Sequence, residues 1–261
     1  MSGAASITAA IKAANADGRP ALIPFMTAGH PNREGFEDHL LILERTADVI
    51  ELGVPFTDPL ADGVTIQRSS EVALKAGVTL NWILDALQQS ASHRSTPVLL
   101  MSYLNPLLTM GYKTLAERCP SAGVAGFIVP DLPYEESAPI RAELEPQGLA
   151  LVQLVSPVTT DDRMRLLCKA SAGFVYAVTV TGVTGGEKQA DHAAMLAYLD
   201  RVRSVSSLPV CAGFGIRDAA QVREIGAHAD GVIVGSALVE VLEQEGDLQA
   251  FLKSLGGKDN V

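Results

Sequence analysis

The sequence predicts an α/β fold in which eight parallel strands, alternating with helices, close into a barrel. Eight short apolar runs recur along the 261 residues, and Gly, Pro or Asp bounds each of them. Most of these runs are almost continuously apolar, which is typical of parallel strands covered on both faces. Amphipathic stretches with helical periodicity lie between the runs. This alternation, over this length, predicts a closed (β/α)8 TIM barrel.

The expected elements follow one another along the whole chain. We expect strands at residues 21–26, 48–52, 98–102, 126–129, 150–155, 173–178, 209–212 and 231–234. We expect helices at residues 36–46, 80–92, 112–118, 135–144, 161–170, 193–205, 219–225 and 236–255, with an extra N-terminal helix at 8–15. A doubly wound open sheet is the alternative, but it usually has a Gly-rich turn after its first strand. Because no linker or charge run interrupts the pattern, we expect one domain over residues 1–261.

Composition and charge exclude several classes of protein. Apolar residues make up 48% of the chain and 19% of the residues are charged, with a net charge of −10. This acidic balance argues against a broad nucleic-acid surface. No apolar run reaches the roughly 18 residues of a membrane span, and the N-terminal stretch lacks the apolar block of a secretory signal. Three distant cysteines and five scattered histidines fit neither a disulfide framework nor a metal site, so we expect a cytoplasmic protein.

Residues 47–63, ADVIELGVPFTDPLADG, place two acids where a barrel builds its active site. Glu51 lies within an apolar strand, where a carboxylate is costly to bury unless it is paired or its pKa is raised. Asp62 lies on the loop that follows this strand, at the carboxyl end of the barrel. There are simpler alternatives. Glu51 could pair with a nearby Arg or Lys, and Asp58 and Asp62 could be turn formers or helix caps.

Glycine clusters follow the last three strands. They read TVTGVTGGEK at 179–188, AGFGIRD at 212–218 and GSALVE at 235–240. Glycines let backbone amides approach an anion, and barrels often bind phosphate after strands seven and eight. Ordinary tight turns are the alternative for any one cluster. With no Walker A or dinucleotide-binding motif, the pattern favours a phosphorylated substrate and acid–base chemistry without a cofactor or a metal.

The motif ELGVPFTDPLADG closely resembles that of the tryptophan synthase alpha chain family. Further motifs that resemble the family follow in the same order: PFMTAGHP, LMSYLNPL, VPDLPYEES, TGVTGGE, AGFGI and VGSALVE. The resemblance implies a carbon–carbon lyase of tryptophan biosynthesis. Such a lyase cleaves indole-3-glycerol phosphate to indole and D-glyceraldehyde 3-phosphate in a retro-aldol-type reaction. It also implies a beta-subunit partner that carries pyridoxal phosphate, in an assembly of two alpha and two beta chains.

The resemblance also implies roles for individual residues. Glu51 matches the general acid–base glutamate, and Asp62 matches the aspartate that supports the indole nitrogen. The expected substrate-binding residues are Phe25, Tyr103, Tyr176, Thr184, Gly185, Gly213, Gly215, Gly235 and Ser236. Asn105 and Pro106 match a loop that faces the beta subunit. Two departures are visible, since Val64 replaces a common proline and residues 178–182, VTVTG, lack an arginine that many members carry.

Other functions remain open at this level. The chain could be a stand-alone indole-producing lyase, or a non-catalytic allosteric subunit, although both expected carboxyls are present. A sugar-phosphate isomerase or decarboxylase is less favoured, because the strand ends offer no obvious catalytic Lys. We expect an apolar docking surface on the loops after the second and third strands. Its residues would be Pro55, Phe56, Pro59, Leu60, Pro106, Leu107 and Leu108.

Overall fold

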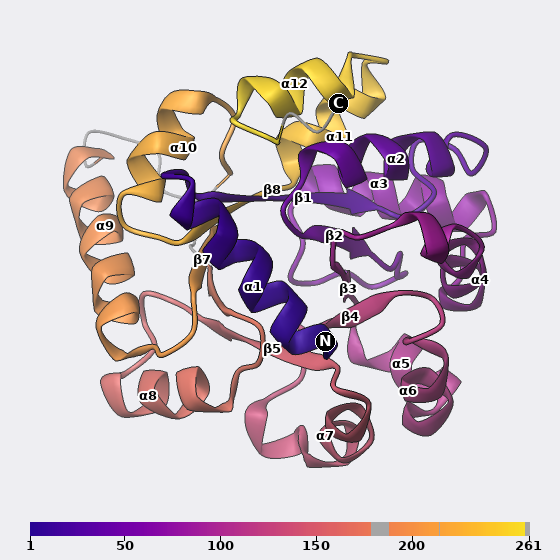
Figure 1. The fold of residues 1–261 in the computed structure, drawn as a ribbon, viewed down its shortest axis with the longest axis horizontal. Coiled ribbons are helices and arrows are strands. Elements are labelled where there is room, and N and C mark those ends of the chain that lie inside the picture. Colours follow the sequence, from indigo (N-terminus) through magenta and orange to yellow (C-terminus); the bar gives the residue numbers. More distant parts are fainter. Residues whose placement is uncertain (179–187, 214, 259–261) are drawn as a thin grey trace.

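The computed structural model describes residues 1–178, 188–213 and 215–258, and its centre is a closed barrel of parallel strands (Figure 1). The strands are β1 (Ala21–Thr27), β2 (Ile50–Gly53), β3 (Val98–Met101), β4 (Val124–Ile128), β5 (Ala150–Val155), β6 (Val175–Val178), β7 (Val210–Gly213) and β8 (Gly231–Val234). They pair in sequence order, and β8 closes the ring against β1. The predicted (β/α)8 barrel is therefore confirmed.

Helices cover the outer side and one end of this barrel (Figure 1). The first six are α1 (Gly3–Ala16), α2 (Phe36–Thr46), α3 (Val64–Lys75), α4 (Leu80–Ser90), α5 (Leu104–Met110) and α6 (Tyr112–Arg118). The others are α7 (Ala138–Leu144), α8 (Asp161–Ala170), α9 (Lys188–Val205), α10 (Ala219–Gly226), α11 (Ser236–Glu243) and α12 (Leu248–Ser254). Short 3-10 turns are η1 (Ala91–His93), η2 (Tyr134–Glu136) and η3 (Glu145–Gln147). Across the described ranges, no helix is both long and apolar enough to span a bilayer.

Helix α1 covers the N-terminal mouth of the barrel, and Figure 1 shows it lying across the centre of the ring. Its buried residues Ile7 and Ile11 belong to the same apolar cluster as the inward-facing strand residues. The Thr8 hydroxyl donates to the Gly173 carbonyl at 2.6 Å, and the Asn15 amide donates to the Asp230 carbonyl at 2.7 Å. Since this end is plugged, the opposite end, where the strands finish, is the one left for chemistry.

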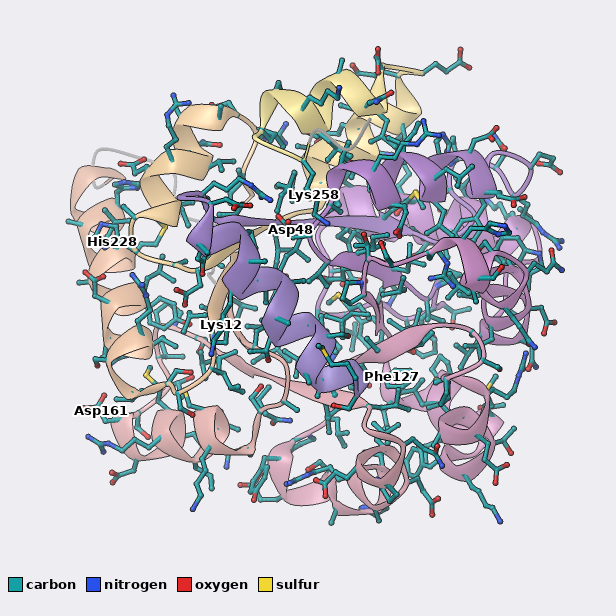
Figure 2. All side chains as sticks on the ribbon, in the orientation of Figure 1. Lys12, Asp48, Phe127, Asp161, His228 and Lys258 are labelled. Carbon is teal, nitrogen blue, oxygen red and sulfur yellow. The ribbon has the colours of Figure 1, made fainter. Side chains whose placement is uncertain are left out.

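A charged cluster at the plugged end joins distant parts of the chain. Asp48 is buried and accepts two hydrogen bonds from the Arg19 guanidinium, at 2.6 and 2.9 Å. It also accepts the Leu22 amide at 2.8 Å. The Lys258 ammonium lies 3.9 Å from the same carboxylate, and Figure 2 shows the two labelled side chains next to each other. Asp48 thus has a structural role at the start of β2, away from the site.

Several expected boundaries were wrong by one to three residues, α9 begins five residues earlier than expected, and two helices were missed. Helix α3 was missed because its buried residues are Ser69, Ser70 and Ala73, which give no apolar stripe. Helix α5 was taken for a loop, but Pro106 lies in its first turn, where proline is tolerated.

The expected helix at 236–255 is two helices, α11 and α12. Glu245 adopts a left-handed conformation with φ 53° between them, and Asp247 caps α12 by accepting the Ala250 amide. The extra helix begins at Gly3, earlier than expected, because Ser2 caps it by accepting the Ala5 amide.

Candidate active site

Glu51 lies on β2 with its carboxyl group inside the barrel. Its side chain is 0% exposed, and in the sheet it lies beside Phe25 on β1 and Leu99 on β3. Neither carboxyl oxygen has a hydrogen-bond partner among the described residues. The alternative in which Glu51 pairs with a nearby Arg or Lys therefore fails within that part of the chain. A buried and unpaired carboxyl group is costly, so it favours the protonated form.

The two acids of the predicted site have different pKa values. Burial raises the Glu51 pKa to about 8, and the negative charge of Asp62 adds to this effect. Burial also raises the pKa of Asp62, to about 6, while a hydrogen bond with Tyr103 opposes the rise. At neutral pH, Glu51 is therefore mainly protonated and Asp62 mainly ionised. A pair of carboxyl groups with separated pKa values can divide the roles of acid and charge stabiliser.

The two loop aspartates also differ in their local structure. Asp58 is exposed, and its carboxylate accepts the neighbouring Thr57 hydroxyl at 2.6 Å, as expected of a turn residue. Asp62 is half-buried, and it does not cap α3, because the N-cap is Gly63 and no side chain bonds there. The turn-former alternative thus holds for Asp58, and the helix-cap alternative fails for Asp62.

Aromatic side chains form the wall around these acids. Phe25, Asp62 and Tyr103 line one small pocket at the carboxyl ends of β1, β2 and β3. Tyr176 on β6 is buried inside the barrel, where burial and then the charge of Glu51 raise its phenol pKa well above the usual value. The hydroxyl of Tyr176 is therefore neutral and available as a hydrogen-bond donor.

Two glycines make this wall possible. A Cβ at Gly53 would lie 2.5 Å from Cζ of Phe25, and a Cβ at Gly213 would lie 2.7 Å from the Tyr176 hydroxyl. Any side chain at either position would displace an aromatic ring from the site. Gly53 was not among the predicted site residues, although it is the last residue of β2, at the carboxyl end of the barrel.

The predicted phosphate residues lie at the ends of adjacent strands β7 and β8. Gly213 ends β7 and Gly215 follows it, while Gly235 is the N-cap of α11 and Ser236 its first residue. Gly235 has no side chain that could cap α11, and the first amides of a helix have no intrahelical partner. Such amides, with the helix dipole behind them, are suited to an anion. Thr184 and Gly185 were also predicted here, and they lie outside the described residues.

The expected docking surface is smaller than the sequence indicated. Leu60 and Leu108 are 93% and 52% exposed. Pro55 and Leu107 are buried, and Leu107 belongs to the core between the barrel and its helices, so the prediction was wrong for both. Phe56, Pro59 and Pro106 are half-buried, while Val64, which was not predicted, is 74% exposed.

Residues to which the sequence analysis gave no role in the active site also support it. The Phe56 ring stacks on Tyr103 with centroids 5.2 Å apart and an interplanar angle of 27°. Asp131 accepts the Leu104 amide at 2.9 Å, which fixes the chain just after Tyr103. Gln67 donates to the Asp62 carbonyl at 2.9 Å. Asp131 could have been found as a polar residue three positions after the end of β4, in the motif VPDLP.

Metal-binding groups are not gathered in the part of the chain that the structure describes. There, no three His, Cys, Asp or Glu side chains lie close enough to hold a metal ion. All three cysteines are buried and free.

Comparison with known proteins gives a consistent picture. The family model described as tryptophan synthase alpha chain matches residues 11–254. A tryptophan synthase alpha chain from Desulfovibrio desulfuricans is 47% identical over 246 residues, covering 93% of this chain and 96% of the relative. One from Xanthomonas euvesicatoria is 46% identical over 237 residues, covering 90% and 88%.

Solved structures agree with these relatives. A chain of ligand-free tryptophan synthase from M. tuberculosis is 35% identical with a TM-score of 0.86, and the match covers 95% of this chain and 96% of that one. The tryptophan synthase A-subunit from Pyrococcus furiosus is 32% identical with a TM-score of 0.83, covering 91% and 98%. With a matching family model and relatives of this identity over nearly its whole length, the chain belongs to the tryptophan synthase alpha chain family.

Proposed function

We propose that this chain cleaves indole-3-glycerol phosphate to indole and D-glyceraldehyde 3-phosphate through Glu51 and Asp62. The observation that carries the proposal is the pair of carboxyl groups. Glu51 is buried without a hydrogen-bond partner among the described residues, and Asp62 lies close enough to raise the Glu51 pKa. Membership of the family supports a carbon–carbon lyase of tryptophan biosynthesis. It does not favour the stand-alone lyase or the non-catalytic subunit.

Cleavage begins with a proton transfer to the indole ring. Protonated Glu51 donates its proton to C3 of indole, and the ring nitrogen becomes positively charged. The ionised Asp62 accepts a hydrogen bond from the ring N–H and stabilises this charge. The Glu51 pKa of about 8 keeps its proton available at neutral pH, and the Asp62 pKa of about 6 keeps that group anionic.

Breakage of the carbon–carbon bond returns the proton to Glu51. The Glu51 carboxylate removes the proton from the C3′ hydroxyl, and the electrons of that O–H bond form the aldehyde carbonyl. The C3–C3′ bond breaks, and its electron pair neutralises the ring nitrogen. Glu51 is then protonated again and ready for the next turnover. General acid–base catalysis of this kind typically contributes about 10² to 10⁴-fold.

Substrate binding would use the wall and the strand ends described above. Phe25, Tyr103 and Tyr176 would hold the indole and glycerol parts. Gly213, Gly215, Gly235 and Ser236 would hold the phosphate, and the uncapped start of α11 supports this role. Thr184 and Gly185 stay predictions for the same site.

A beta subunit is the partner that the family implies. We propose that two alpha and two beta chains assemble, and that pyridoxal phosphate belongs to the beta chain, since the family's alpha chain carries no cofactor. Exposed Leu60, Val64 and Leu108 support docking on the rim beside Asp62. One domain over residues 1–261 and a cytoplasmic location stay predictions of the sequence.

Indole release by the purified chain, with and without a beta subunit, tests the proposal. The wild type should release indole from indole-3-glycerol phosphate, weakly alone and faster in the complex. Glu51→Gln and Asp62→Asn should lose nearly all turnover, while Asp58→Asn, on the same loop, should retain it. Near-normal turnover by Glu51→Gln would rule out the assigned role.

A further inference from the structure

The hydroxyl group of Tyr103 joins the rim of the barrel to the loop that carries Asp62. Tyr103 lies two residues after the end of β3, and it is buried, with 7% of its surface exposed. Its hydroxyl oxygen accepts the backbone N–H of Ala61 at 2.9 Å. A phenol has one proton to donate, and the Ala61 contact leaves that proton free. Asp62 lines the same pocket as Tyr103, and the two side chains share a hydrogen bond, in which the carboxylate accepts the phenol proton.

Contacts on both sides hold the Tyr103 ring in one place. Phe56 stacks on the ring. The Ser102 amide donates to the Ile128 carbonyl at 3.0 Å, and the Leu104 amide donates to Asp131 at 2.9 Å. These bonds fix the backbone before and after Tyr103 to the neighbouring strand β4 and the loop that follows it. The hydroxyl is therefore a fixed point, to which the loop with Asp62 is attached.

We propose that Tyr103 is a positioning residue that acts through Asp62, holding this carboxylate in place and in its anionic form. The inference rests on the proposed function, in which Asp62 must be negatively charged to stabilise the indole nitrogen. It changes the role expected from the resemblance, in which Tyr103 is a substrate-binding residue. Under the new role, the hydroxyl matters for the charge of Asp62, and the ring alone would suffice for a wall.

The surroundings of Asp62 support this role. Glu51 faces Asp62 from β2, Tyr176 from β6 and Tyr103 from the end of β3, while Asp131 acts on Tyr103 from the loop after β4. Burial favours the neutral form of Asp62. Among the described residues, the Tyr103 hydrogen bond is what lowers the Asp62 pKa, and no cation contributes. Without this hydroxyl, protonation of Asp62 would extend to higher pH.

Tyr103→Phe tests the proposal, because it keeps the ring stacked on Phe56 and removes the hydroxyl. Ala61 is exposed, so its amide can bond to water and the fold should survive. A hydrogen bond to a charged group shifts an ionisation by about tenfold. In the alpha–beta complex, the acidic limb of the kcat/KM profile should therefore move up by about one pH unit. At pH values above this limb, the kcat/KM of Tyr103→Phe should stay close to that of the wild type.

A matched control and a second readout separate the outcomes. Tyr112→Phe removes a hydroxyl from a half-buried tyrosine at the start of α6 and should leave the profile unchanged. Carboxyl ¹³C NMR of Asp62 in the isolated chain should show the same upward shift in Tyr103→Phe without any turnover. The inference would be overturned if, in Tyr103→Phe, neither the acidic limb nor the Asp62 titration moved and KM were raised at every pH. Tyr103 would then act by binding the substrate directly. A wild type that releases no indole would instead overturn the proposed function, and the inference with it.

Discussion

Replacing Glu51 with glutamine should stabilise the protein at alkaline pH while it abolishes the proposed activity. Glutamine has nearly the shape of a protonated glutamate, and it cannot ionise. In the wild type, Glu51 must either hold a proton or leave an unpaired charge inside the barrel, since neither oxygen has a partner among the described residues. Glutamine stays neutral at every pH, so the variant never has a charge buried at this position, and its barrel packing should be unchanged.

The size of the effect follows from the shift in the Glu51 pKa, from 4.5 to about 8. Between these pH values the folded state binds more protons than the unfolded state. The free energy of unfolding therefore falls as pH rises, by about 1.4 kcal/mol per unit for this group. The contribution of Glu51 is complete below pH 4.5 and is lost by about pH 8, a total of roughly 5 kcal/mol.

Urea unfolding of the wild type and of Glu51→Gln, from pH 5 to pH 9, measures this difference. Other titrating groups are common to both proteins, so they cancel when the two free energies are subtracted. The free energy of unfolding of Glu51→Gln, relative to that of the wild type, should rise by about 4 kcal/mol between pH 5 and pH 8 and then level off. Glu34→Gln, the same substitution at an exposed glutamate, should follow the wild type at every pH.

Parallel pH curves for the wild type and Glu51→Gln would refute the reasoning. They would mean that the Glu51 carboxyl ionises in the folded protein as easily as in the unfolded chain. Burial would then not control its protonation, and the division of roles between Glu51 and Asp62 would lose its basis.

Four more predictions follow from the same structure. The kcat/KM for indole release should rise through about pH 6 and fall through about pH 8, as Asp62 loses its proton and then Glu51 does, and a flat profile would contradict both assignments. Gly235→Asp should weaken binding of glycerol 3-phosphate by roughly tenfold or more in calorimetry, because a carboxylate would face the phosphate. Leu108→Asp should weaken beta-subunit binding by about tenfold in a kinetic titration, and unaltered activation would exclude this surface. Burial lowers the pKa of His30, so acid should destabilise the fold as pH falls below 6.5, and His30→Gln should reduce that loss in urea unfolding.

The sequence alone determined the architecture and indicated where we propose that the chemistry takes place. Runs of continuous apolar residues, separated by helical periodicity, are properties of short segments, and eight of them in alternation leave few folds other than a barrel. Glu51 was conspicuous for the same local reason, as a carboxylate among apolar neighbours. Asp62 was singled out because it lies on the loop that follows that strand.

Tertiary structure decided which side chains meet. The sequence could not show that Tyr103 bonds to the Ala61 amide, 42 residues away along the chain. It also left the pairing of Glu51 open, because partners from any strand could have reached a residue inside the barrel. The structure shows no partner for it among the described residues, so burial, together with the negative charge of Asp62, raises the Glu51 pKa.

Burial was also decided by closure of the barrel. Leu60 and Leu107 are both leucines on rim segments, yet Leu60 is exposed and Leu107 is fully buried. The apolar periodicity of the sequence did not reveal helix α3, because serines and an alanine form its buried face. Local pattern reports the polarity of each residue, whereas exposure and ionisation depend on what distant segments place around it. The sequence therefore determined the barrel and the two acids, and the tertiary structure decided their charge.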